Sequence, residues 1–385
     1  MPCVPDVLDP ADPSVGVPRY LRDWLDLQRN LFLQPGAAVE LLGRFPGPRS
    51  ALRAHPRARP STAVELDAAV EALVRSRVVA VPFGSAAYPT ALATLADAAP
   101  LLLVRGEVAA LAAPSVAMVG SRAATAYGRS VARQLATEFA EAGLVVVSGL
   151  ALGIDAIAHS AALDAGGRTV AVQACGPDRV YPRRHQGLAQ RIEDQGAIVS
   201  EFPPGTAPLP HHFPLRNRLI SGLALAVVVV EARERSGSLI TAQHAADQGR
   251  DVFAVPGPIS APTSAGPNQL LRDGAGIVLS AEDVLGELRR TGGLPSPPRR
   301  PPDPLGSNDA GLTEERRRIV RELVREPSTR DHLARRLGLA PEQLALDLLE
   351  LEMDGHVTED RDGRLRVVRD WDAGYAGRGC AGKCE

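Results

Sequence analysis

The sequence predicts an α/β protein in which a doubly wound, mostly parallel sheet lies between a small helical N-terminal domain and a C-terminal winged-helix domain. Short β-branched runs alternate with glycines and helical stretches in the middle of the chain. Apolar-periodic runs with proline joints precede them, and three helical runs with a hairpin follow a proline-rich stretch. The 385 residues leave room for two or three domains of roughly 100 to 200 residues each.

Residues 1–80 are expected to form the helical domain, and residues 81–290 the sheet domain. In the first, apolar residues recur at helical spacing in Leu21–Leu33, Ala37–Leu42 and Ala63–Val74. In the second, continuous apolar runs indicate strands buried on both faces, and the intervening helices indicate right-handed crossovers between parallel strands. These runs are Val116–Val119, Leu144–Val147, Thr169–Val172, Ala197–Val199, Ala226–Val230 and Val252–Val255.

Three segments are expected after residue 290. Residues 291–312 contain six prolines and no apolar periodicity, which is typical of an extended linker. Residues 313–368 predict the winged helix: Thr313 caps a helix through Val324, Ser328 or Thr329 caps one through Leu337, a third spans Ala340–Met353, and Asp362-Gly363 turns between two strands. The glycine-rich residues 369–385 are expected to be a disordered tail.

Composition excludes several classes of protein. The single lysine is Lys383, so 42 of the 43 Lys and Arg residues are arginine, and neither a Walker A loop nor a pyridoxal site is expected. No Gly-x-Gly-x-x-Gly is present, which argues against NAD or FAD, and we expect no cofactor. The scattered cysteines predict reduced thiols and no metal site. Without an apolar span or a leader pattern, we expect no membrane association and a cytoplasmic location.

Polar residues with glycines follow several predicted strands. The carboxyl ends of parallel strands meet at one edge of the sheet, where helix N-termini present N–H groups to anions. Each turn alone is weak evidence, but several together with an arginine favour an anion site. Asp155 and His159 share a helix face, and we favour an orienting role for them over catalysis. The turns are Gly120-Ser121-Arg122, Ser148-Gly149 through Gly153, Ser236-Gly237-Ser238 and Pro256-Gly257.

The stretch Phe202–Val230 contains no acid but holds Phe213, Arg216, Asn217 and Arg218. Guanidinium groups bind phosphate, an aromatic ring stacks on a base, and the amide hydrogen-bonds, so the set suits single-stranded nucleic acid. The alternative is that Phe213 lies in the core and that the arginines pair with acids elsewhere in the fold.

Several motifs in a fixed order resemble the DNA-processing protein DprA (Smf) family over roughly residues 85–290. They are Val119-Gly120-Ser121-Arg122 with Tyr127-Gly128, Ser148-Gly149-Leu150-Ala151-x-Gly153-Ile154-Asp155 with Ala158-His159, Tyr181-Pro182, Ser200-Glu201-Phe202-Pro203, Phe213-Pro214-x-Arg216-Asn217-Arg218, Ser236-Gly237-Ser238-Leu239-Ile240-Thr241 and Val255-Pro256-Gly257.

This resemblance implies a Rossmann-like domain and a non-enzymatic homodimer that binds single-stranded DNA during natural transformation, protects it and helps to load the RecA recombinase. Duplex binding would be weak. One departure is Pro210, where relatives often carry a lysine, and His211 or His212 would substitute weakly. The implied DNA contacts are Gly120, Ser121, Arg122, Ser148, Gly149, Arg183, Phe213, Arg216, Asn217, Arg218, Ser236 and Gly237.

The flanking domains are given smaller roles. Leu33–Gly36 is a poor version of a phosphate-gripping hairpin, so we assign no DNA contact to the first domain. The presumptive recognition helix Pro341–Asp354 carries five acids and no Lys or Arg, so the phosphate backbone should repel it. We expect it to contact protein or to close the fold.

Two rival functions remain at this point. A nucleotide-hydrolysing enzyme of a related Rossmann-like fold would use Glu201 or Glu231 beside the phosphate pocket. A transcriptional regulator would act through the winged helix, which the acidic helix disfavours. Turnover of a nucleotide separates the first from a binding protein, and sequence-specific duplex binding separates the second.

Overall fold

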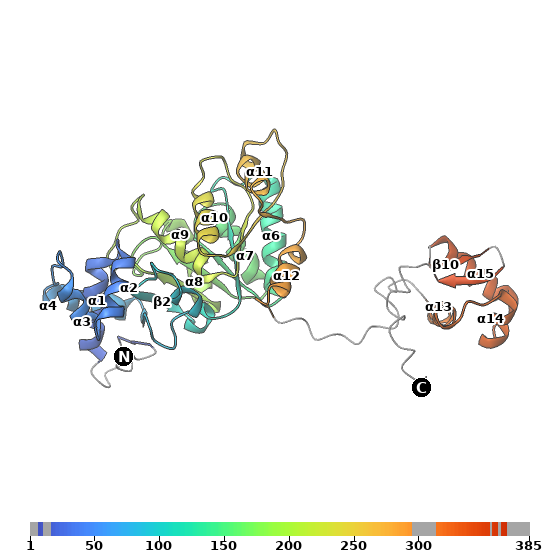
Figure 1. Ribbon diagram of the computed structural model, residues 1–385, viewed down its shortest axis with the longest axis horizontal. Helices are drawn as coiled ribbons and strands as arrows, with labels where there is room; N and C mark the ends of the chain where they lie inside the picture. The colour runs from blue at the N-terminus through green and yellow to red at the C-terminus, as the bar shows by residue number, and fades with distance from the viewer. Residues whose placement is uncertain (1–6, 11–16, 295–312, 355, 361–362, 368–385) are drawn as a thin grey trace, which may run out of the picture. The chain divides into compact units, whose positions relative to one another are not determined.

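The computed structural model describes residues 7–10, 17–294, 313–354, 356–360 and 363–367. The chain forms two compact units, residues 1–295 and 296–385 (Figure 1). Most of the expected linker, the expected tail and Asp362 of the expected turn lie outside the described residues. The domain boundary at residue 80 stays a sequence-based prediction.

A nine-stranded sheet forms the centre of the first unit, in the order β1-β2-β6-β5-β4-β3-β7-β8-β9. From β6 to β9 all neighbouring strands are parallel, whereas β1 and β2 pair antiparallel at one edge. The predicted doubly wound, mostly parallel sheet is confirmed; β1, β2 and β9 were not expected as strands. The strands are β1 (Val79–Pro82), β2 (Leu101–Gly106), β3 (Ser115–Val119), β4 (Val145–Ser148), β5 (Thr169–Gln173), β6 (Ala197–Ser200), β7 (Ala226–Val229), β8 (Asp251–Ala254) and β9 (Gly276–Ile277).

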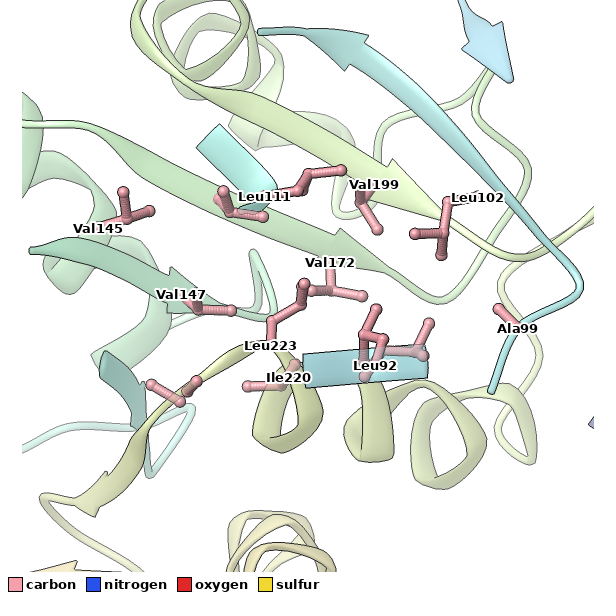
Figure 2. Close-up of a cluster of buried hydrophobic side chains, with 14 of the residues drawn as sticks. Leu92, Ala99, Leu102, Leu111, Val145, Val147, Val172, Val199, Ile220 and Leu223 are labelled. Atoms are coloured by element: carbon pink, nitrogen blue, oxygen red, sulfur yellow. The ribbon is translucent and has the colours of Figure 1, made fainter. Parts of the chain in front are cut away.

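Helices cover both faces of the sheet because successive side chains of a strand point to opposite faces. Val145 and Val147 pack on one face, and Val146 on the other. The first face carries α5 (Thr90–Ala93), α9 (His212–Leu223) and α10 (Gly237–Asp247), and Figure 2 shows Ile220 and Leu223 of α9 beneath Val147 and Val172. The second carries α6 (Ala126–Glu141), α7 (Ile154–Asp164) and α12 (Ala281–Arg290).

Smaller helices complete the sheet layer. α8 (Gln186–Gln195) packs on β5 and β6 through Ala189 and Ile192. α11 (Ala265–Arg272) contacts β8. Three 3₁₀ turns lie in the connections: η1 (Val108–Leu111), η2 (Arg183–His185) and η3 (Pro262–Ser264).

Four amino-terminal helices pack against the antiparallel edge of the sheet, where Figure 1 shows them grouped beside β2. Trp24 of α1 shares a buried cluster with Ala80, Leu101 and Leu103, and the side chain of Gln28 donates to the carbonyl of Leu101. The short α3 was not expected. The helices are α1 (Val17–Leu31), α2 (Pro35–Arg44), α3 (Pro48–Ala54) and α4 (Ala63–Arg75).

The second unit has the predicted winged-helix composition of three helices and a hairpin. Ile319, Leu333, Leu348 and Leu365 are buried in one cluster that draws on every element. Thr313 caps the first helix by accepting a hydrogen bond from the backbone N–H of Arg316. The elements are α13 (Glu314–Arg325), α14 (Arg330–Leu337), α15 (Pro341–Met353), β10 (Val357–Glu359) and β11 (Leu365–Val367).

Candidate nucleic-acid interface

A pocket of about 630 Å³ opens at the carboxyl edge of the sheet. Its walls come from the segment after β3 (residues 120–123), the segment after β7 (residues 233–238) and the start of α9. The chain winds from β3 towards β6 on one side and continues through β7 on the other, so the pocket lies where the strand order reverses. Ligands of open α/β sheets bind at such switch points.

Aromatic rings and guanidinium groups meet in this pocket. The ring centroids of Tyr181 and Phe213 lie 5.8 Å apart. The guanidinium carbon of Arg122 lies 5.1 Å from the centroid of Phe213, and that of Arg216 lies 5.9 Å from it. Tyr181 and Arg122 are exposed and Phe213 is half-buried. Phe213 is therefore neither free of packing nor a core residue, and the pocket offers a ring next to an accessible cation, as nucleotide binding requires.

Arg216 is a buried arginine that organises the pocket floor. Its Nη1 donates to the carbonyl oxygen of Gly149 at 2.7 Å and to that of Val172, and its Nε donates to the side chain of Asn217. Burial lowers the pKa of Arg216 to about 10, and neighbouring Asp155 opposes that shift. Its Nη2 has no acceptor among the described residues.

The turn after β4 supports Arg216 and reaches the pocket wall only through Ala151. A Cβ on Gly149 would lie 2.7–2.8 Å from three atoms of the Arg216 guanidinium, so only glycine allows this approach. Asp155 accepts hydrogen bonds from the backbone N–H groups of Gly149 and Ala151. Ser148 is fully buried and donates to the carbonyl of Met118. Ser148 and Gly149 were expected to contact DNA. In the structure they instead hold neighbouring groups of the site in place.

Asp155 and His159 do not pair with each other. The carboxylate of Asp155 holds the turn, while His159 Nδ1 lies 2.6 Å from the hydroxyl of Thr169. Burial raises the pKa of Asp155 and lowers that of His159 to about 3, so the imidazole is neutral. Both side chains act as orienting groups, as expected from the sequence.

The start of α10 forms the opposite wall. Ser236 caps this helix through the N–H of Ser238, and both serines line the pocket with Gly237. Asn217 donates to the carbonyl of Gly237 at 3.2 Å and so ties α9 to α10. The free N–H groups and the dipole at a helix N-terminus favour anions. Asn217 thus links α9 to α10, and Ser236 and Gly237 lie at the pocket, as expected from the sequence.

Arg218 does not reach the pocket, contrary to its assignment as a DNA contact. Its side chain is 3% exposed and pairs with the carboxylate of Glu201, which is 1% exposed, while Asp97 lies 3.4 Å from its Nε. Two residues along a helix correspond to a rotation of about 200°, so Arg218 faces away from the side occupied by Arg216. For this residue the alternative, pairing with acids of the fold, holds.

The carboxylates of the enzymatic alternative are also engaged in the fold. Glu231 is buried and accepts from the backbone N–H and the hydroxyl of Thr125 at 3.0 and 2.5 Å, at the start of α6. Burial raises the pKa of Glu201 to about 7, against the opposing effect of Arg218. Of the described residues that line the pocket, Asp155 alone is acidic, and its Oδ2 holds the turn.

Of the remaining residues that were expected to contact DNA, some line the pocket and one does not. Gly120 and Ser121 line the pocket beside Arg122, whereas exposed Arg183 lies in η2, two residues beyond Tyr181. His212 cannot substitute for the missing lysine, because it is buried and stacks on Phe202 with 4.7 Å between ring centroids.

Arg233 and Arg235, two exposed arginines of the pocket wall, were not predicted as site residues. Their signal was available as Arg-x-Arg directly before the turn at Ser236. In the described part of the chain, no group of three or more His, Cys, Asp or Glu side chains is placed to hold a metal ion. No helix of the described residues has the length and apolar character needed to cross a membrane.

Comparison with known proteins matches residues 80–289 to the model of the DNA recombination-mediator protein A family and residues 296–363 to the DprA winged helix domain. The chain is 40% identical over 291 residues to protein Smf of Escherichia coli, covering 75% of this chain and 77% of Smf. It is 45% identical over 278 residues to the putative DNA processing protein DprA of Mycobacterium tuberculosis, covering 72% and 69%. The X-ray structure of DNA processing protein A from Streptococcus pneumoniae superposes with a TM-score of 0.57 at 38% identity, covering 66% of this chain and 86% of that one.

Proposed function

Because this chain belongs to the DNA recombination-mediator protein A family, we propose that it binds single-stranded DNA in the pocket between β3 and β7 and passes it to a recombinase. The observation that carries the proposal is the exposed guanidinium of Arg122, 5.1 Å from the ring of Phe213. Single-stranded DNA can place a phosphate against the guanidinium and stack a base on the ring.

Each wall has a separate task in this proposal. Arg122, Arg233 and Arg235 hold phosphates as charge-assisted hydrogen-bond donors. The N–H groups at the start of α10 add a neutral anion site. Tyr181 and Phe213 stack on bases, whose faces are accessible in a single strand but are covered by neighbouring pairs in a duplex. This explains a preference for single strands without reading of base edges.

The role in the cell follows from the family. We propose that the protein acts in the cytoplasm as a homodimer, protects incoming single strands in natural transformation and helps to load RecA. We also propose that it performs no chemistry, because Glu201 and Glu231 hold Arg218 and Thr125, and Asp155 holds a turn. For the winged helix we propose a protein contact, since α15 exposes Leu346, Leu349 and Met353 between acids.

Fluorescence anisotropy of labelled oligo-dT tests the binding proposal. The Arg122→Ala variant should bind at least ~10-fold more weakly, because a charge-assisted contact is lost. Its slope of log affinity against log salt should fall by about 0.7 for the one phosphate. Arg168→Ala is the matched control, because Arg168 is also exposed but precedes β5 at the opposite edge of the sheet.

Two results would overturn this function. One is duplex of equal length bound as tightly as oligo-dT, with Arg122→Ala no weaker than the control. The other is release of a base or phosphate from a nucleotide by the wild type, which would favour the hydrolytic enzyme.

A further inference from the structure

Residues 41–64 carry a one-sided charge. They contain five arginines and one histidine but no aspartate or glutamate, although the whole chain has a net charge of −2. All five arginine side chains are exposed to solvent. They lie at the end of α2, on α3 and in the segment before α4: Arg44, Arg49, Arg53, Arg57 and Arg59.

Carboxylates of the fold leave most of this charge uncompensated. Arg44 pairs with Glu40 at 3.3 Å, and both side chains are more than 60% exposed, so water screens the attraction between them. Within the described residues, no carboxylate lies at ion-pair distance from the other four guanidinium groups. The nearby acids have other contacts: Asp26 accepts from the N–H of Ser61, and Glu65 pairs with Arg29.

Three of the five arginines lie beside α1. Arg49 and Arg53 line a hollow of about 520 Å³ with Tyr20, Asp23 and Phe45. Further along α1, a second hollow of about 560 Å³ is lined by Arg59. It also contains Asn30, which lies roughly 15 Å along the helix from Tyr20 at 1.5 Å per residue. The side chain of Asn30 accepts the N–H of Arg59 at 2.8 Å and so fixes that segment.

The second hollow adjoins the DNA pocket. Residues 203–206 form its far wall, and Pro208 and Pro210 of the same loop line the pocket. Thr206 and Pro208 are two residues apart, so their Cα atoms are separated by at most ~7 Å. One short loop therefore lines both the hollow and the pocket.

We propose that a DNA strand held in the pocket crosses the loop 203–210 and continues along α1. There its phosphates contact an arginine track made of Arg53, Arg57 and Arg59. The inference rests on the function proposed above and extends it to the amino-terminal helices, which the sequence analysis left without a DNA contact. Guanidinium groups suit this task because they bind phosphate oxygens through paired N–H donors.

A length series tests the track. The full chain is titrated with labelled oligo-dT of about six nucleotides, enough for the pocket, and of about twenty, enough for pocket and track. The triple variant Arg53→Gln, Arg57→Gln, Arg59→Gln should bind the longer strand at least ~10-fold more weakly, with the salt slope reduced by about 2. Affinity for the shorter strand should stay within about twofold, since no phosphate of it reaches the track.

The matched control removes the same charge elsewhere in the unit: Arg75→Gln, Arg168→Gln, Arg191→Gln, which break only exposed ion pairs. The track is refuted if the two triple variants bind the longer strand alike, or if the track variant loses affinity equally for both lengths. A loss confined to duplex of twenty base pairs would also refute the continuation, because the surface would then take duplex. Failure of the wild type to bind either strand would instead reject the pocket itself.

Discussion

Replacing Arg218 by methionine should destabilise the protein without removing a DNA contact. Arg218 and Glu201 are 3% and 1% exposed, so the variant leaves a buried carboxylate without its cation. Breaking a buried pair from one side costs about 3–5 kcal/mol. In the Glu201→Gln, Arg218→Met double variant no charge is stranded, so at least about half of the lost stability should return.

Urea unfolding of wild type, Arg218→Met, Glu201→Gln and the double variant measures the effect. Anisotropy with oligo-dT is recorded on each protein below its unfolding transition. We expect a lower midpoint for Arg218→Met and an affinity within about threefold of wild type, as for a residue outside the site. Wild-type stability combined with a loss of affinity greater than ~10-fold would show that Arg218 reaches phosphate, and would refute the assignment made from its burial.

Three further predictions concern the site, the second unit and pH. Gly149→Ala places a Cβ against the Arg216 guanidinium and should weaken oligo-dT binding by roughly 3- to 10-fold. The control Gly187→Ala adds a Cβ in open space and should leave the affinity unchanged. Equal affinities of the two variants would show that the contact between Gly149 and Arg216 does not matter for binding. A chain lacking residues 300–385 should keep oligo-dT affinity within ~10-fold, and a larger loss would place a DNA contact in the winged helix. The raised pKa of Glu201, about 7, means that the folded state holds its proton to higher pH than the unfolded state. As the pH is raised from about 5 to about 8, the urea midpoint of wild type should therefore decrease relative to that of Glu201→Gln. An increase over this range would contradict the raised pKa of Glu201.

Much of the central architecture was predictable because strand and helix patterns are local. The run Ala226–Val230 needs only its own residues to be recognised as a strand buried on both faces. The carboxyl edge of such a sheet then locates the pocket. Gly120, Ser121 and Arg122 lie there as expected. The pairing of β2 with β6 is antiparallel and joins segments almost a hundred residues apart, so no local pattern could predict it.

The sequence by itself determined the parallel strands β3 to β8, the edge that carries the site and the presence of arginines and an aromatic ring near it. Only the tertiary structure decided which arginines face the ligand. Arg216 meets carbonyls 67 and 44 residues away, and Arg218 meets a carboxylate 17 residues away. It also brought Arg235 and Tyr181 into one pocket. A helical or strand period depends on neighbours along the chain, whereas the partner of a charged side chain depends on which distant segments pack beside it.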